Sequence, residues 1–512
     1  MTNQMEPARR KRAFLPKVRT GCLTCKARKI KCDQGKPHCQ RCISTGRKCD
    51  GYRPPPSSTT PSPSPAPTQT QALFASKAER RSFHYFQTQA SQSLGGYFHS
   101  SFWGREVLQA AIHHPPIRHL VIALGAAYEV FHDGSVPEHD ENVGGMELAL
   151  RQCNRSIARL GALTTASPGT PQSIETVCCV LTASVLFVYL ASVRGHLAEA
   201  IGHVRSGMKV LHDFDLSIRH SPSSPSYPVP VSQLRGLLIS LYGQLRAMVD
   251  DVALETNTTG DILVSHLKPA IIYISIPEAH RHVEALFYNT LAFCQDAAIR
   301  PPTSPERLEA VVGRHRELCG VLESSREALD VLSKSYDSEL AGPSRQDKGI
   351  MVLRLYHLVI AVRLRIDVLR PDQRESAFDG LEDDFDEMLG YCEKLVEAGH
   401  GNTPRKPSCS SGLGYVMPLH TIAARCRTPR IRRRAVYLLS AHSRREGLWD
   451  GVLAGRIATH AQGMEEDIDN VPDKRIREVK IKFQGDKAAL LQFVTVGDWK
   501  RGEQGAQQVI EW

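Results

Sequence analysis

Six cysteines in the N-terminal part of the chain have the residue type and the spacing of a metal site. They are Cys22, Cys25, Cys32, Cys39, Cys42 and Cys49. Adding 17 to each of the first three positions gives the last three, so the pattern is an internal repeat. Each half opens with two cysteines separated by two residues, a spacing that lets two thiolates bind one metal ion. The repeat therefore predicts a zinc site.

The number of ligands favours a cluster of two zinc ions. A closed structural zinc site has four ligands in a tetrahedron, so two separate sites need eight. The repeat supplies six thiolates, and the nearby His38 could add only one more ligand. The count closes if two thiolates each bridge both ions. Because so short a segment has almost no apolar core, we expect zinc binding to supply its folding energy.

Two alternatives to the cluster are a disulfide scaffold and two independent zinc sites. The start MTNQMEPARRKR has no apolar stretch after its basic residues, so we expect no secretory signal and a reducing compartment. Independent zinc sites would usually show eight Cys or His ligands. The other eight cysteines show no paired metal spacing, and we expect small buried hydrophobic residues there. They are Cys153, Cys178, Cys179, Cys294, Cys319, Cys392, Cys409 and Cys426.

The positive charge of the chain is concentrated around this repeat. Residues 1–53 contain fifteen Lys and Arg and three acids, whereas the whole chain of 512 residues has a net charge of +10. The remaining residues therefore sum to about −2. Four basic residues lie between Cys25 and Cys32, but only two lie between Cys42 and Cys49. This asymmetry predicts that the first half of the repeat faces a polyanion, since Lys and Arg can contact guanine O6 and N7.

The run GCLTCKARKIKCDQGKPHCQRCISTGRKC closely resembles the fungal Zn2Cys6 (binuclear zinc cluster) transcription factors. It matches them at all six cysteines, at the basic run 26–31 and at Pro37. The resemblance implies two short helices around two Zn²⁺ per chain, with Cys22 and Cys39 bridging both ions. Each of the other four cysteines would then bind one zinc. It also implies a nuclear, sequence-specific regulator of RNA polymerase II genes that binds double-stranded DNA.

The same resemblance assigns roles to the basic residues. It places the base contacts at Arg28 and Lys29 and implies a CGG-type half-site in the major groove. The other basic residues of the repeat are expected at phosphates, which position a protein without specifying sequence. These are Lys26, Lys31, Arg41, Arg47 and Lys48. The run Arg9, Arg10, Lys11 and Arg12 predicts a nuclear localisation signal, and its alternative interpretation is a plain basic tail.

The elements that must carry these residues fall into four regions. Residues 1–21 form a basic N-terminal arm, and residues 22–49 form the zinc-stabilised DNA-binding domain. Residues 50–76 form a Pro/Ser/Thr-rich linker, whose stretch 54–76 has seven prolines and no charge. Proline removes backbone donors and fixes φ, so we expect a flexible, extended linker there. Residues 77–512 form one large domain.

The large domain is predicted to be all-α. Ser or Thr followed by Pro predicts helix starts at 170–171, 304–305 and 428–429, because the hydroxyl can cap and Pro suits the first helical position. Residues 270–276 are one short strand candidate. Pro/Ser-rich breaks near 164–172, 220–232 and 400–412 predict surface loops.

A few side chains of the large domain carry separate predictions. The helix predicted to start at 428–429 is expected to place three basic residues on its solvent-exposed face: Arg432, Arg433 and Arg434. Trp103 and Trp449 are expected as core anchors.

One segment of the large domain needs a membrane test. Residues 176–193 are eighteen uncharged residues, at the low edge of a bilayer span. They include Thr182, Ser184 and Ser192 and have no flanking Lys/Arg cluster. We therefore expect a buried central helix and no membrane partner.

Three stretches of the large domain resemble the regulatory domain that often accompanies this zinc cluster. They lie at 79–98, 196–214 and 426–450. The resemblance implies control of activity through a ligand or partner, with the transcription machinery or co-regulators as further partners. An enzyme or scaffold with a basic docking head is the competing hypothesis, but G-x-S-x-G, H-E-x-x-H and G-x4-G-K-[ST] motifs are absent from the sequence.

The oligomeric state stays open at the level of the sequence. A coiled coil directly behind the cluster is excluded by the seven prolines of 54–76, and residues 77–98 show no sustained heptad repeat. The sequence is compatible with two states: a homodimer through the C-terminal domain, and a monomer bound to one half-site.

Overall fold

The computed structural model describes most of the chain in twelve segments. They are residues 20–52, 73–133, 140–165, 173–218, 227–248, 267–299, 302–336, 344–398, 406–441, 443–466, 471–485 and 487–512. Contacts divide the chain into two compact units, Met1–Ala72 and Leu73–Trp512. We call residues 20–52 the zinc module and residues 73–512 the body, and we describe each by itself.

The zinc module is built from two short helices that start at equivalent points of the repeat. Helix α1 is Leu23–Ala27 and helix α2 is Gln40–Ile43. Cys22 is the N-cap residue of α1, and Cys39 is the N-cap residue of α2. The predicted pair of short helices is therefore present.

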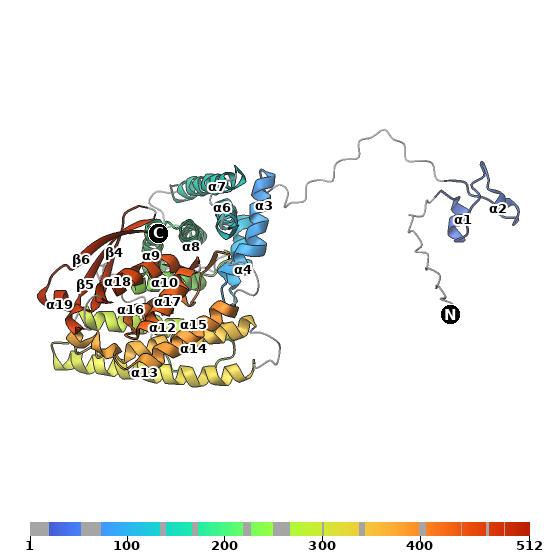
Figure 1. Cartoon of the computed structure of the whole chain (residues 1–512). Coiled ribbons are helices and arrows are strands. Elements are labelled where there is room, and N and C mark those ends of the chain that lie inside the picture. The colour runs from blue at the N-terminus through green and yellow to red at the C-terminus, as the bar shows by residue number, and fades with distance from the viewer. Residues whose placement is uncertain are drawn as a thin grey trace, which may run out of the picture. The chain divides into compact units, whose positions relative to one another are not determined.

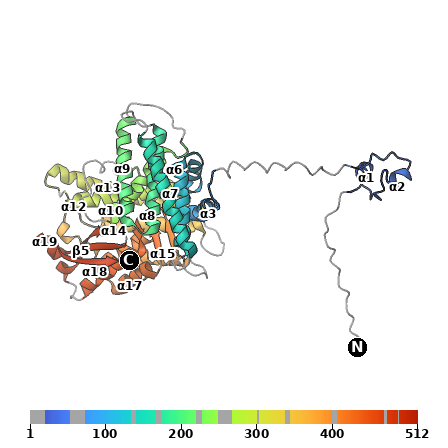
Figure 2. The ribbon, with the colours of Figure 1, turned by 90° about the horizontal axis from the view of Figure 1, so that it is seen from above.

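The first half of the body is a set of packed helices. In chain order they are α3 (Lys77–Tyr85), η1 (Phe86–Ala90), α4 (Ser91–Leu94), η2 (Phe102–Glu106), α5 (Val107–His113), α6 (Pro115–Asp133), α7 (Asp140–Thr165), α8 (Ile174–Arg194), α9 (Leu197–Ile218) and α10 (Val231–Met248). Figure 2 shows α6, α7, α8 and α9 side by side, and α8 packs against both α6 and α9. The bulky side chains of these helices, including Trp103, form one continuous apolar core.

Helix α8 is the segment that passes the length and composition test for a membrane span. It is the one helix that does so among the residues described. Its apolar stretch lies mostly inside the body, where neighbouring helices cover it on several sides. The prediction of a buried central helix is confirmed.

The second half of the body adds more helices and two small sheets. Its helices are α12 (Ile276–Ile299), α13 (Pro305–Lys334), α14 (Arg345–Leu364), η3 (Pro371–Gln373), η4 (Ser376–Phe378), α15 (Glu382–Ala398), α16 (Val416–Arg425), α17 (Pro429–Ala441), α18 (Gly451–Glu466), η5 (Pro472–Lys474) and α19 (Val496–Arg501). In Figure 1, α12, α13, α14 and α15 lie along one side of the body. Trp449 anchors this second core, as predicted.

The two sheets have three strands each. In the first, β1 (Ser408–Ser410) pairs parallel with β2 (Arg444–Glu446), which pairs antiparallel with β3 (Trp449–Asp450). In the second, β5 (Ala488–Thr495) lies between β4 (Ile476–Phe483) and β6 (Ala506–Glu511), and both pairings are antiparallel. The helical body is confirmed, and the six strands among the described residues are an addition that we did not predict.

The Ser/Thr-Pro rule found two helix starts correctly. Ser304 caps α13, where its hydroxyl accepts a hydrogen bond from the backbone N–H of Arg307, and α17 begins at Pro429. The third predicted start, 170–171, lies outside the described residues, and α8 begins after Ser173 instead.

Three further predictions for the body were wrong in whole or in part. Residues 270–276 are not a strand, because they form an irregular lead-in to α12. The break at 400–412 contains β1, whose Cys409 and Ser410 are buried, so it is not a surface loop throughout. Arg432 does not lie on a wet face: it is 8% exposed and pairs with Glu465 at 2.6 Å. The inward ion pair removes its charge from solvent.

Candidate zinc cluster and nucleic-acid interface

Each helix of the zinc module fixes one C-x2-C pair through its first turn. The Sγ atom of Cys22 accepts a hydrogen bond from the backbone N–H of Cys25 at 3.3 Å. The Sγ atom of Cys39 accepts the equivalent bond from Cys42 at 3.4 Å. A sulfur at the N-cap position thus satisfies a free helix N–H and at the same time points towards the centre of the module.

The six sulfur atoms form two groups of four that share two members. One group is Cys22, Cys25, Cys32 and Cys39, and the other is Cys22, Cys39, Cys42 and Cys49. Within each group all sulfur atoms lie within 4.8 Å of one another. The Sγ atoms of Cys22 and Cys39, which belong to both groups, are 3.6 Å apart.

These distances fit tetrahedral zinc. A regular tetrahedron with Zn–S bonds of about 2.3 Å has S–S edges of about 3.8 Å. The Sγ atom of Cys25 is 3.7 Å from that of Cys39, and the Sγ atoms of Cys22 and Cys42 are 3.9 Å apart. Each group of four is therefore compact enough to surround one ion.

The thiol groups differ in acidity between positions of the module. Burial raises the pKa of Cys22 to about 12, and burial likewise raises the pKa of Cys39. Backbone N–H groups of Cys22 and Gln34 lower the pKa of Cys32 to about 6. A divalent cation would stabilise all six as thiolates, because metal binding and thiol deprotonation are coupled.

Two aspartates that sequence reasoning missed hold the halves of the module together. Asp33 accepts hydrogen bonds from the backbone N–H groups of Gln40 and Arg41 at 2.9 and 3.0 Å, at the start of α2. Asp50, 17 residues later, accepts one from the Thr24 hydroxyl at 2.8 Å, in the first turn of α1. The repeat was the signal that could have found this pair, since both follow the third cysteine of a half.

The backbone keeps the symmetry of the repeat at two pairs of positions where the residue types differ. Lys29 has φ of 55°, in the left-handed region, and the equivalent residue of the second half is Gly46, with φ of 64°. The same relation holds for Gln34 and Gly51. Glycine adopts this conformation without steric cost, whereas lysine does not. The first half thus keeps an unfavourable lysine where a glycine would suffice for folding.

The predicted DNA contacts lie on the surface of the module. Lys26, Lys29, Lys31, Arg41, Arg47 and Lys48 are exposed, and Arg28 is half-buried. Arg28 donates a hydrogen bond to the Thr45 hydroxyl at 3.3 Å. Within residues 20–52 the structure shows no ion pair between these basic residues and the two aspartates. Their charge is therefore available to an external anion.

The chain matches two known families, in the order that the sequence suggested. Residues 20–59 match the family described as the fungal Zn(2)-Cys(6) binuclear cluster domain. Residues 81–230 match the family described as the fungal specific transcription factor domain. The chain belongs to the fungal Zn2Cys6 transcription factors. It is therefore a zinc-containing, DNA-binding transcription regulator and not an enzyme.

Curated relatives of the transcription factor carry regulatory names. The aspercryptin biosynthesis cluster-specific transcription regulator atnN of Emericella nidulans is 24% identical, over 88% of this chain and 87% of its own. The transcription regulator lscL of Purpureocillium lilacinum is 27% identical, over 38% of this chain and 48% of its own. Arginine metabolism regulation protein II of Saccharomyces cerevisiae is 56% identical, but over only 7% of this chain and 4% of its own. No solved structure shows significant similarity to the chain.

Some predicted residues of the transcription factor lie elsewhere. Arg9, Arg10, Lys11 and Arg12 lie outside the described residues. Of the eight cysteines beyond the module, six are buried, and Cys294 and Cys319 are half-buried. Within the described part of the chain, the six-cysteine module is where metal-ligating groups gather.

Proposed function

We propose that residues 22–49 hold two Zn²⁺ and bind double-stranded DNA. Cys22 and Cys39 bridge both ions in this proposal, and Cys25, Cys32, Cys42 and Cys49 each bind one. The observation that carries it is that the two groups of four sulfur atoms share those two members. Zinc supplies the cross-links that stand in for an apolar core, and the cysteines fix the helix that presents the basic run.

The proposed target is a CGG-type half-site that the protein contacts in the major groove. The regulated genes are those transcribed by RNA polymerase II. Arg28 and Lys29 contact bases, because Arg and Lys side chains pair with guanine O6 and N7. Lys26, Lys31, Arg41, Arg47 and Lys48 contact phosphates. The left-handed backbone of Lys29 supports the assignment, since local strain tends to persist where a side chain has a functional role.

Zinc content and DNA binding of the full-length protein test this function together. We expect two zinc ions per chain and EDTA-sensitive binding to CGG-containing duplexes. A matched duplex with the CGG triplet scrambled should bind at least about tenfold more weakly. Fewer than two zinc ions per chain, or binding that survives chelation, would contradict the proposal.

The arrangement of half-sites is tested separately. A homodimer through the C-terminal domain should bind paired half-sites cooperatively, whereas a monomer should bind single and paired sites with the same affinity per site. Gel shifts on single, inverted and direct repeats of CGG, with the full-length protein, distinguish these states.

We further propose a nuclear location and a biosynthetic gene cluster as the regulated target. The basic run Arg9 to Arg12 supports nuclear import. The similarity to a biosynthesis cluster-specific regulator over 88% of the chain supports the second part. Replacing all four basic residues by Ala in a fluorescent fusion should reduce nuclear signal. Mapping of genomic binding sites should place them in promoters of clustered biosynthetic genes, and scattered sites would contradict that target.

A further inference from the structure

A cavity of about 190 Å³ lies inside the body, far along the chain from the cysteine repeat. Its walls come from α10, α12, α14, α16, α18 and strand β4. Most of the lining side chains are apolar, including Met248, Leu291, Met417 and Trp449. An apolar cavity of about 150 Å³ holds one benzene molecule, so this space suits a compact ligand of roughly ten non-hydrogen atoms.

Positively charged side chains outnumber negatively charged ones in the cavity wall. The wall contains four arginines and two acidic residues. The arginines are Arg363, Arg374, Arg425 and Arg477, and the acids are Asp367 and Glu478. More arginines than acids beside an apolar wall favour a ligand that is itself apolar with one anionic group.

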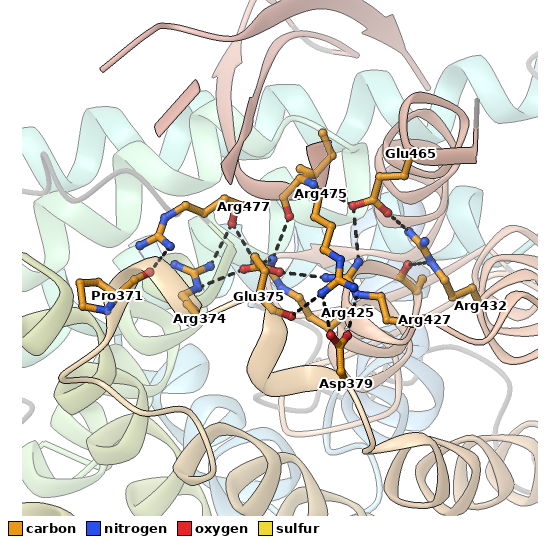
Figure 3. Close-up of polar contacts among 12 residues, drawn as sticks. Pro371, Arg374, Glu375, Asp379, Arg425, Arg427, Arg432, Glu465, Arg475 and Arg477 are labelled. Atoms are coloured by element: carbon orange, nitrogen blue, oxygen red, sulfur yellow. Dashed lines mark hydrogen bonds and ion pairs between the residues drawn. The ribbon is translucent and has the colours of Figure 1, made fainter. Parts of the chain in front are cut away.

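Two of these arginines are already bound to a protein carboxylate. The Glu375 carboxylate, 1% exposed, lies 2.8 Å from Arg425 Nη1 and 3.3 Å from Arg374 Nε. Both arginines also donate a hydrogen bond to the backbone carbonyl of Arg477, at 3.1 and 3.0 Å. Figure 3 shows these groups gathered around Glu375. They hold the first residues of β4 in place and are poorly placed to take another anion.

Arg477 differs from these two. Its side chain is 2% exposed, and in Figure 3 its guanidinium points away from Glu375 towards the carbonyl oxygen of Pro371, to which it donates. The guanidinium lies 3.8 Å from the centre of the Trp499 ring. Its Nε atom is buried without a hydrogen-bond partner among the described residues. The Glu478 carboxylate is 3.6 Å away, too far for a hydrogen bond.

Such a buried arginine is costly unless an anion offsets it. Burial lowers the pKa of Arg477 to about 10, yet a guanidinium stays charged at neutral pH. A buried charge without a close, hydrogen-bonded partner destabilises a fold, and a carboxylate can satisfy two N–H groups of a guanidinium at once. The cavity therefore offers Arg477 as an anion-binding group at the edge of an apolar space.

We propose that this cavity binds a small organic acid, with its carboxylate on Arg477 and its apolar part, about the size of one ring, against Met248, Leu291 and Met417. This ligand site goes beyond the proposed DNA-binding function and does not depend on it. A ligand here would contact helices of the second half of the body together with β4, and so would couple the second sheet to the helical core.

Calorimetric titration of the zinc-loaded full-length protein tests the proposal. The probes are phenylpropionate and octanoate, each compared with its neutral amide of the same shape. We expect at least one acid to bind at millimolar concentration or better, and its amide to bind at least about tenfold more weakly. Binding of neither acid, or equal binding of acid and amide, would overturn the proposal.

Four variants separate ligand binding from folding, which circular dichroism checks for each. Arg477→Gln should reduce acid binding to the level of the amide, and Arg477→Lys should keep part of the preference for the acid. Ala424→Leu, which places a larger side chain on the α16 wall, should weaken acid and amide alike. Arg434→Gln is the control, because Arg434 is 44% exposed and pairs with Glu393 away from the cavity. Unchanged acid binding by a folded Arg477→Gln or Ala424→Leu protein would overturn the assignment.

Discussion

At the scale of single residues, Lys29 and Gly46 are the most informative pair in the zinc module. They are equivalent by the repeat of 17 and share a left-handed backbone, so the fold itself requires only what glycine supplies. A side chain in this conformation costs roughly 1 kcal/mol relative to glycine. The module carries that cost in the half with four basic residues, and we therefore expect the lysine side chain to be used in DNA binding.

Replacing Lys29 therefore separates base recognition in DNA from the folding of the zinc module. Lys29→Gly should leave zinc binding and the stability of the module unchanged or slightly improved, because it relieves the backbone strain. Lys29→Gly and Lys29→Ala should each lose about 1–3 kcal/mol of affinity for the cognate site and relax the base preference. Titrations on cognate and scrambled duplexes measure both effects.

A matched change in the second half is the control for this prediction. Gly46→Lys should strain the backbone by roughly 1 kcal/mol without removing a base contact. If Lys29→Gly bound the cognate duplex as tightly as the unmodified protein, Lys29 would not be a base-reading residue.

Lys31 should behave differently, because a phosphate contact carries no sequence information. Lys31→Ala should weaken cognate and scrambled duplexes alike, and it should reduce the slope of log affinity against log salt by about one. Titrations at several salt concentrations give that slope. A loss confined to the cognate duplex would place Lys31 at a base instead.

The sequence was sufficient for some residues and not for others. The cysteine pattern identified the sulfur atoms that come together, because metal spacing is local. Arg432 was assigned to a wet face because helical periodicity shows where a side chain points, but not that Glu465 lies there to receive it. Ion-pair partners more than 30 residues apart leave no mark in a local pattern.

At the scale of elements, local signals again decided what could be predicted. The start of α13 was found because Ser304 and Pro305 are neighbours, and α8 because eighteen uncharged residues are contiguous. The strand β4 was missed although Val479 to Phe483 alternate between apolar and basic residues, a pattern typical of a strand. The three-residue β1 has no such pattern, and only its pairing with β2 makes it a strand.

Glu375 gives a prediction at the element scale, because it joins the turn η4 to α16 and its neighbouring loop. It is 1% exposed and lies within 3.3 Å of the neighbouring Arg374, of Arg425 in α16 and of Arg427 in the loop after α16. Glu375→Gln should destabilise the body by about 3–5 kcal/mol, because it leaves several buried guanidinium groups without their anion. Urea unfolding followed by circular dichroism measures the loss.

The comparison variant for Glu375 is Glu393→Gln. Glu393 pairs with Arg434 on the surface, where both side chains are at least one-third exposed. Exposed pairs contribute only about 0–1 kcal/mol, so the unfolding midpoint should hardly change. Similar midpoints for both variants would mean that the arginine cluster around Glu375 contributes little to the stability of the body.

At the scale of the whole molecule, the two compact units rely on different sources of stability. The module has a core of cysteines, to which Tyr52 adds partly buried apolar surface. The body has large apolar cores of its own, which contain no residue of the module. Removal of zinc should therefore unfold one unit and spare the other.

Chelation of the full-length protein tests this independence. EDTA should abolish DNA binding, because apo zinc modules of this size lack the apolar core to stay folded. The helical circular dichroism signal should fall only slightly, since α1 and α2 contain five and four residues. The thermal unfolding midpoint of the body should stay the same, and re-addition of zinc should restore binding. A large loss of helicity, or a lowered midpoint, would show that the body needs the zinc module for its own stability.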